Sequence, residues 1–150
     1  ERLLRDALQM DRAWMPVPNA PAGLPLHCLI THPGLAGALR TLSCHQAIGH
    51  DACFAVSLLA EFDHLIEAGA WHYRELFQEA GLIGQALYLQ AEAEGYRGTG
   101  IGCYFDDAVH DILGMADQRL QVLYQFTVGQ ALVDTRIRTE PPYAHRASTS

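Results

Sequence analysis

The residues with the clearest chemical spacing are three glycines, Gly98, Gly100 and Gly102, in the segment RGTGIGCYFDD. Alternating glycines in an extended strand leave the backbone bare on one side, so that a partner can approach it closely. The spacing differs from the Gly-x-Gly-x-x-Gly fingerprint of dinucleotide-binding proteins, which follows a strand and opens a helix. The pattern therefore predicts close approach to the backbone and leaves the approaching group open.

A long helix is predicted directly before this segment, over residues 73–94. Large apolar residues recur there at three- and four-residue steps, which is the period of one buried helix face. Gly81 and Gly84 lie within the pattern, although glycine inside a helix costs roughly 1 kcal/mol relative to alanine. Two glycines three positions apart indicate that another helix or a flat ligand packs against the backbone.

Helices and strands are predicted to alternate along the rest of the chain. Strands are expected at residues 26–31, 53–59 and 120–128, and 53–59 is expected to be central because it is almost wholly apolar. Further helices are expected at 1–10 (with Leu3, Leu4, Ala7 and Leu8 inward), 35–48, 63–68 and 106–114, the last with Asp106 as its N-cap. This order predicts an α+β fold of three layers, α/β/α.

Length and composition limit the class of protein. The 150 residues suit a single domain, 1–150, in which 133–150 form an extended C-terminal arm. A net charge of −7 argues against nucleic acid as a partner, and no apolar run is long enough to span a membrane. A hydrophobic content of 49% favours a buried interface with another chain. Because the chain starts with Glu1 inside a helix pattern, we expect an N-terminal truncation or a larger polypeptide.

Four cysteines are present: Cys28, Cys44, Cys53 and Cys103. They form no CxxC pair, and no signal peptide is visible, so we expect reduced thiols in a cytoplasmic protein. Two cysteines and two histidines between positions 44 and 53 match no standard set of zinc ligands, and we therefore predict no metal site.

Four segments resemble, in the same order, the FMN-dependent nitroreductase-like superfamily. The stretch EAGLIGQALYLQAEAEGYRGTGIGCYFDD is similar to the central helix and flavin-side segment of that family. PNAPAGLPLHCLI resembles the loop and strand near the flavin ring, VLYQFTVGQ the last core strand, and VDTRIRTEPPYAH the arm at the flavin phosphate. The resemblance covers about residues 3–145 and is greatest for the azoline (thiazoline/oxazoline) dehydrogenase branch. It implies a mostly antiparallel sheet, a long central helix and a homodimer with shared flavin sites.

The resemblance also implies which residues contact FMN. The ring is expected to meet a bare backbone segment and a small-residue loop, and the phosphate to meet basic side chains of the arm. These residues are Gly100, Ile101 and Gly102 in the segment, Pro18, Asn19 and Ala20 in the loop, and Arg136 and Arg138 in the arm. His72 and Tyr73, at the start of the long helix, are expected either on the substrate side or in interface packing.

Two departures from the family pattern leave two functions open. The N-terminal arginine-rich stretch that grips the phosphate has no counterpart here, and the Lys-Tyr pair of azoline dehydrogenases is replaced by Glu67 and Ala68. Glu67 is a candidate base, or else an ordinary surface residue. The first hypothesis is an FMN-dependent oxidoreductase that transfers hydride through flavin N5, with NAD(P)H as a reductant and a small-molecule or peptide substrate. The alternative is a flavin-free, dimeric scaffold in a tailoring complex.

Overall fold

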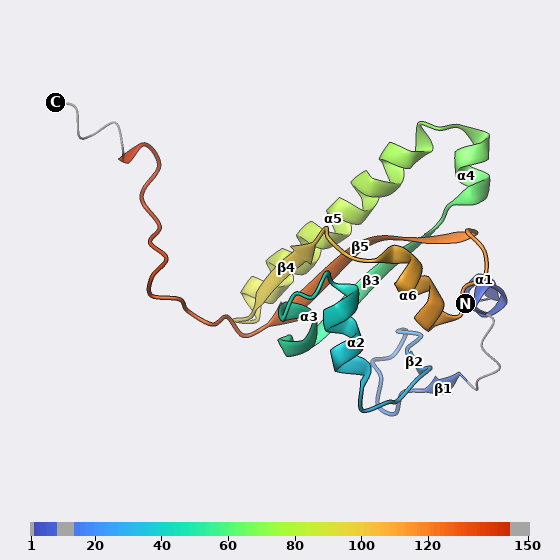
Figure 1. Cartoon of the computed structure of the whole chain (residues 1–150), viewed down its shortest axis with the longest axis horizontal. Coiled ribbons are helices and arrows are strands. Elements are labelled where there is room, and N and C mark those ends of the chain that lie inside the picture. Colours follow the sequence, from blue (N-terminus) through green and yellow to red (C-terminus); the bar gives the residue numbers. More distant parts are fainter. Residues whose placement is uncertain (1, 9–13, 145–150) are drawn as a thin grey trace.

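The computed structural model describes residues 2–8 and 14–144, which form three layers (Figure 1). The middle layer is a three-stranded antiparallel sheet made of β3 (Phe54–Glu61), β4 (Arg97–Ile101) and β5 (Leu120–Gly129). One face carries α4 (Asp63–Ala68) and the long α5 (His72–Ala93). The other face carries α2 (Leu35–Leu42), α3 (Ile48–Asp51) and α6 (Asp106–Leu113). The predicted α/β/α fold class is confirmed.

The central strand of the sheet is β5. The strand order is β3-β5-β4, and β5 pairs antiparallel with both of its neighbours. Phe126, in the middle of β5, is fully buried, whereas Phe54 at the start of β3 is 50% exposed. The prediction that 53–59 would be central is therefore wrong, although Leu58 and Leu59 of this strand do pack against helices on opposite faces of the sheet. An apolar run shows that a strand packs against something, but not on which edge it finds a partner strand.

A β-bulge in β5 changes which face of the sheet its side chains point toward. Leu58 pairs with Tyr124 while the next residue, Leu59, pairs with Val122, so that Leu123 is the extra residue. Val122 then faces α2 and α6, while Leu123 and Tyr124 both face α5. The strict alternation of side chains along a strand would have placed Val122 and Tyr124 on the same face.

The long helix α5 confirms the helix predicted at 73–94. Its buried positions are four or seven residues apart, as expected for one face of a helix: Leu76, Ala80, Gly84 and Ala91. The short α4 coincides with the predicted 63–68, and the N–H of Gly69 closes it by donating to the carbonyl of Leu65. Together, α4 and α5 cover the side chains that β3 and β5 present on this face of the sheet.

The opposite layer departs from prediction at two points. The helix expected over 35–48 is interrupted after Leu42, and α3 begins only at Ile48, because Cys44 and His45 between them have left-handed backbones, with φ of 51° and 60°. The predicted N-cap Asp106 is also wrong: Phe105 occupies that position, and the Asp106 carboxylate lies in the first turn, where it is favourable to the helix dipole. Gly114 ends α6 with a φ of 67°, as its glycine predicted.

The N-terminal region packs at one end of the sheet. It comprises α1 (Arg2–Ala7) and the two-stranded hairpin of β1 (Met15–Pro16) and β2 (His27–Cys28). Ala7 and Leu8 are buried with Met115 and Leu120, but Leu3 is 41% exposed, so its predicted inward orientation is wrong. The strand expected at 26–31 pairs over only two residues, and part of the helix expected at 1–10 lies outside the described residues.

After Gly129 the chain leaves the sheet as an extended segment that runs away from the three layers (Figure 1). Leu132 and Val133 are 96% and 80% exposed, so in a single chain this segment is packed against little. It corresponds to the arm predicted over 133–150, of which residues 145–150 lie outside the described part. Within the described residues, no helix has the length and apolar character needed to cross a membrane.

Candidate functional site

The glycine segment forms the edge strand β4. Gly98 pairs with Val128, Gly100 with Phe126 and Ile101 with Gln125, all in antiparallel register with β5. The backbone N–H of Gly100 donates to the hydroxyl of Tyr88 on α5, at 2.7 Å. The predicted extended conformation is confirmed, and the side chain of Ile101 is buried.

Two aromatic rings of β5 occupy the space beside the first two glycines. A Cβ on Gly98 would collide with the ring of Phe126, and a Cβ on Gly100 would collide with the phenol of Tyr124. Tyr88 packs edge-to-face on Phe126, with ring centroids 4.7 Å apart. These glycines are therefore required by packing between the sheet and α5. That explains the alternation of glycines without any ligand.

Gly102 differs from the other two glycines of the segment. No atom lies within 4 Å of the position that its Cβ would occupy, and the residue is exposed. It follows the last residue of β4, where the chain turns away from the sheet toward α6. The open backbone predicted from the glycine pattern is thus present at Gly102, just beyond the strand.

The segment after Gly102 is fastened to the turn that follows α2. Cys44 and Cys103 form a disulfide, so the expectation that all the cysteines are reduced is wrong for this pair. The backbone N–H of Phe105 donates to the carbonyl of Leu42 at 2.9 Å. Sequence reasoning missed the pair because 59 residues separate the two cysteines. Only the sheet, which ends β4 beside the turn after α2, brings them together.

The other two cysteines are not paired. Cys28 is half-buried and Cys53 is exposed, and both are free thiols. In the part of the chain that the structure describes, no three His, Cys, Asp or Glu side chains gather as metal ligands.

The predicted flavin loop is the turn between β1 and β2. Pro18, Asn19 and Ala20 lie there at the surface or half-buried, and Asn19 has a left-handed φ of 62°. The backbone N–H of Ala20 donates to the carbonyl of Val17 at 3.3 Å, which closes the turn. The hairpin packs on the α2 and α6 side of the sheet, because His27 and Cys28 line a cavity there with residues of both helices.

The predicted phosphate contacts lie on the exposed arm. Arg136 makes a bidentate ion pair with Asp134, whose shortest N–O distance is 2.6 Å. Hydrogen bonds from Arg136 lower the pKa of the Asp134 carboxyl, and Asp134 in turn raises the pKa of the guanidinium. Arg138 is also exposed. The arm that carries both arginines runs away from the three layers in a single chain (Figure 1), and their contact with a phosphate stays a prediction.

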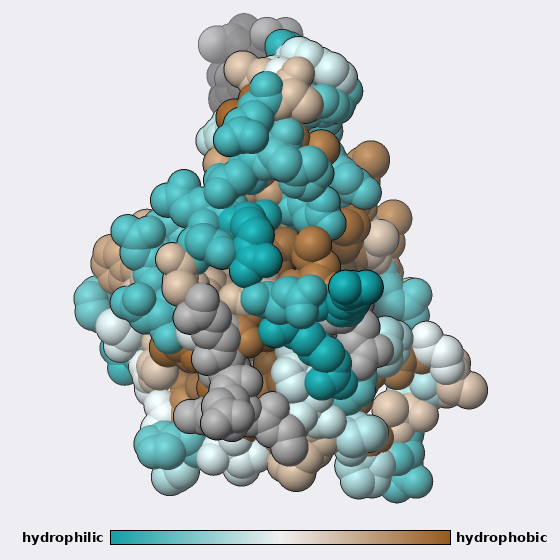
Figure 2. All heavy atoms as spheres, turned by 90° about the vertical axis from the view of Figure 1, so that its right-hand side faces the viewer, coloured by the Kyte–Doolittle hydropathy of each residue, from teal (hydrophilic) through white to brown (hydrophobic). Residues whose placement is uncertain are grey.

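The remaining candidate residues lie at the junction of α4 and α5. Glu67 is exposed near the end of α4. The ring of His72 stacks on Trp71, with centroids 3.6 Å apart, and its Nδ1 lies 3.1 Å from a carboxylate oxygen of Glu75. Figure 2, which views the molecule from the side of α1 and α4, shows hydrophobic atoms exposed between hydrophilic ones on this face.

Tyr73 lines a cavity of about 280 Å³ between the starts of α5 and α6. Its walls combine aromatic rings, among them Phe62 and Phe77, with the carboxylates of α6. Tyr104 also lines it and donates through its hydroxyl to the carbonyl of Val122 at 3.2 Å. Burial raises the pKa of Tyr104, and the neighbouring Asp106 adds to that effect. This cavity begins two residues beyond Gly102.

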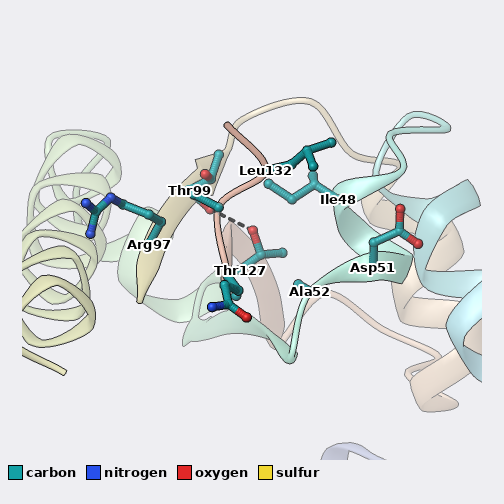
Figure 3. Close-up of a pocket in the computed structure, with 10 residues that line it drawn as sticks. Ile48, Asp51, Ala52, Arg97, Thr99, Thr127 and Leu132 are labelled. Atoms are coloured by element: carbon teal, nitrogen blue, oxygen red, sulfur yellow. Dashed lines mark hydrogen bonds between the residues drawn. The ribbon is translucent and has the colours of Figure 1, made fainter. Parts of the chain in front are cut away.

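A larger cavity of about 450 Å³ lies at the opposite end of β4, and sequence reasoning missed it (Figure 3). Its floor is the sheet, where the hydroxyl of Thr127 donates to the carbonyl of Thr99 at 3.2 Å. Ile48 of α3 and Leu132 of the arm lie next to each other along it, and Arg97, on the other side, is paired with Glu92 at 2.8 Å. Its lining comes from three separate segments of the chain, so no local sequence motif predicts it. A lining that combines apolar side chains with two hydroxyls suits a small organic molecule.

Comparison with known proteins agrees with this architecture. A family model described as the nitroreductase family matches residues 31–130. In sequence, no curated protein matches the chain. Among solved structures, a candidate nitroreductase from Anabaena variabilis ATCC 29413 is similar with a TM-score of 0.64 and 30% identity, over 71% of this chain.

Two further solved structures share the fold at lower identity. A candidate NAD(P)H:FMN oxidoreductase from Staphylococcus epidermidis ATCC 12228 has a TM-score of 0.54 and 12% identity, and NfrA1 of B. megaterium has 0.55 and 20%, each over 77% of this chain. The chain spans 22% of the Anabaena protein, 70% of the Staphylococcus protein and 53% of NfrA1. Because the family model covers more than half of the chain, including α5, β4 and β5, the chain belongs to the nitroreductase family.

Proposed function

We propose that this chain is the core of an FMN-dependent oxidoreductase that works as a homodimer. The observation that carries the proposal is the family match over residues 31–130, which contains the long helix and the glycine strand together. The Staphylococcus relative is named as an NAD(P)H:FMN oxidoreductase, which supports NAD(P)H as the reductant. When bound, FMN would supply hydride chemistry at N5, toward an acceptor such as a nitroarene or quinone.

The residues of one described chain meet only part of what FMN needs. A flavin ring needs a flat slot with free backbone N–H groups, and the phosphate needs positive charge. Gly102 leaves its backbone open, but the N–H of Gly100 is donated to Tyr88, and Arg136 is neutralised by Asp134. The described residues of a single chain therefore supply only part of an FMN site. The remaining contacts would come from the second copy in an assembled dimer.

The outer face of α5 supports a second copy of this chain as the partner. Leu82 and Leu89 are 72% and 63% exposed there, and the stretch between Glu79 and Glu92 carries no charged residue. A helix that is apolar on both faces is normally buried on both faces. Pairing α5 with its counterpart would cover these side chains and place the arm of one copy against the core of the other.

The finer parts of the proposal concern substrate and compartment. Glu67 and Ala68 stand where azoline dehydrogenases have a Lys-Tyr pair, so a peptide azoline is a less suitable substrate than a small electron acceptor. Glu67 is exposed on α4 and lines neither the cavity of about 280 Å³ nor the one of about 450 Å³. We propose a cytoplasmic location, where NAD(P)H is available.

A flavin-free scaffold is the second candidate function. It is favoured by the packing of Gly98 and Gly100, since Tyr124 and Phe126 fill the space that a flat ligand would need on that face of β4. The pairing of Arg136 with Asp134 points the same way. In that case the dimer would remain and flavin binding would be absent.

The two functions are separated by an FMN titration followed by visible absorption and flavin fluorescence. Wild type and the variants Gly102→Leu and Gly37→Leu are compared, because both glycines are exposed with no atom within 4 Å of an added Cβ. The oxidoreductase predicts retained flavin in wild type and Gly37→Leu, bleaching by NAD(P)H, and weaker binding by Gly102→Leu. A folded dimer that binds no FMN supports the scaffold, and equal binding by all three rejects Gly102 as the ring contact.

A further inference from the structure

We propose that Cys44 and Cys103 form a thiol–disulfide exchange site whose disulfide is opened and re-formed by an external thiol, either glutathione or a protein dithiol. The two sulfurs are joined in this structure between the turn after α2 and the segment after β4. This activity goes beyond the proposed oxidoreductase function and requires no flavin.

The two cysteines differ in their access to solvent. Cys103 is exposed and follows Gly102, beside which no side chain stands, whereas Cys44 is half-buried. An incoming thiolate therefore reaches the sulfur of Cys103 more easily than that of Cys44. Exposed disulfides are the ones that behave as labile, regulatory or catalytic pairs, whereas structural ones resist reduction.

The exchange balances as two successive displacements. A thiolate attacks Sγ of Cys103, which forms a mixed disulfide and releases Cys44 as a thiolate. A second thiol attacks the external sulfur of the mixed disulfide and releases Cys103. Two external thiols are thereby oxidised to one disulfide, the protein disulfide is reduced to two thiols, and the protons of the external thiols pass to the cysteines through solvent.

Several contacts would keep the two cysteines together after reduction. The Phe105 N–H donates to the Leu42 carbonyl at 2.9 Å, and the side-chain amide of Gln46 donates to the carbonyl of Cys103 at 3.3 Å. The rings of His45 and Phe105 also meet edge-to-face, with centroids 6.0 Å apart. These contacts do not depend on the S–S bond, so re-oxidation remains intramolecular, at a high effective concentration of one thiol near the other.

The backbone at Cys44 indicates what reduction would change. Cys44 and His45 have consecutive left-handed conformations, with φ of 51° and 60°, which residues other than glycine seldom adopt. The disulfide helps to hold this turn, so reduction should loosen the turn and the segment after Gly102, while β5 stays as it is. A reversible pair of this kind also suits a reducing compartment, where disulfides are transient and catalytic or redox-sensing.

The proposal is tested on the full chain carrying Cys28→Ser and Cys53→Ser, so that no other thiol reacts. The protein is equilibrated at a series of ratios of reduced to oxidised glutathione, and the oxidised fraction is measured by maleimide mass shift. We expect complete, reversible conversion across these ratios in the folded protein. In hydrogen exchange, we expect faster exchange at residues 43–46 and 102–105 on reduction, and no change in β5. A disulfide that opens only after denaturant is added, or cysteines that never pair, would overturn the proposal.

Single variants in the same background test which sulfur is attacked. Cys44→Ser should accumulate glutathione on Cys103, because the resolving thiol is missing, whereas Cys103→Ser should accumulate less on the half-buried Cys44. Equal or reversed labelling would reject Cys103 as the attacked sulfur. Circular dichroism of both variants confirms that they are folded. Since no flavin takes part, failure here leaves the result of the FMN titration unaffected.

Discussion

Gly84 and Gly81 lie three residues apart on neighbouring sides of the same helix, and their surroundings differ. A Cβ on Gly84 would lie 2.8 Å from the ring of Tyr124, so this glycine exists because the sheet comes close to α5. A Cβ on Gly81 would meet no atom within 4 Å. Packing against the sheet therefore explains Gly84, whereas nothing within one chain explains Gly81 on the flank of the helix.

The two faces of α5 differ in how well a single chain covers them. The inner face of α5 is a finished core, in which Tyr88, Tyr124 and Phe126 fit against glycines of α5 and β4. The outer face keeps large apolar side chains, including Leu82 and Leu89, in contact with solvent. Gly84 is therefore explained within a single chain, whereas Gly81 and the exposed leucines are consistent with a second copy that packs on α5.

The inner face should fail most severely when its largest buried ring is removed. Phe126 is fully buried between Gly98 and Tyr88, so Phe126→Ala should lower the free energy of unfolding by about 3–5 kcal/mol. Urea unfolding measures the change. The matched control is Phe54→Ala on β3, because Phe54 is 50% exposed and should lose much less. Similar losses for the two variants would contradict the contrast between a finished core and an open edge.

Adding a single methyl group tests the inner glycine. Gly84→Ala should lower the free energy of unfolding by about 1–3 kcal/mol, because the ring of Tyr124 must move, although alanine alone favours a helix. The double variant with Tyr124→Leu should recover much of the loss, and a double-mutant cycle measures this coupling. A net stabilisation by Gly84→Ala would mean that the contact with Tyr124 is not limiting.

The same substitution at Gly81 should change the free energy of unfolding of a monomer in the opposite direction. Gly81→Ala should raise the free energy of unfolding of dilute protein by about 0.5–1 kcal/mol, since alanine reduces the entropy of the unfolded chain. If α5 pairs closely with a second copy, this variant should also weaken self-association, measured by sedimentation. Leu89→Lys serves as a companion that should disrupt the dimer through charge. Unchanged association in both variants would place the interface elsewhere.

Alkaline titration gives the smallest expected effect on the inner face. Burial raises the pKa of Tyr124, and its neighbour Tyr88 adds to the shift. The folded state then holds the phenol proton more tightly than the unfolded state does. The associated stability is present below pH 10 and is lost as the pH rises through the folded pKa. Between pH 10 and the folded pKa, the free energy of unfolding should fall more for wild type than for Tyr124→Phe, as measured by chemical denaturation. Equal losses would show that Tyr124 does not contribute.

The elements that could be predicted are those whose cause is local. α4 begins and ends at the predicted residues, and α5 follows the predicted helix closely, because apolar spacing and terminal glycines act within a few turns of chain. The three glycines of the segment 98–102 predicted an open backbone, which is found at Gly102 but not at Gly98 or Gly100. The division of the 35–48 helix was not predictable in this way, because it depends on two left-handed residues in a turn tied to a distant segment.

The sequence alone was enough to indicate the family, the α/β/α alternation and the extended glycine segment, since these depend on neighbours along the chain. Only the tertiary structure decided that β5 rather than β3 is central, that Tyr124 and Phe126 occupy the space beside Gly98 and Gly100, and that Cys44 meets Cys103. The physical reason is that a residue type states what a position tolerates, whereas the partner that fills it comes from segments tens of residues away. That partner is fixed only when the sheet and its two layers close together.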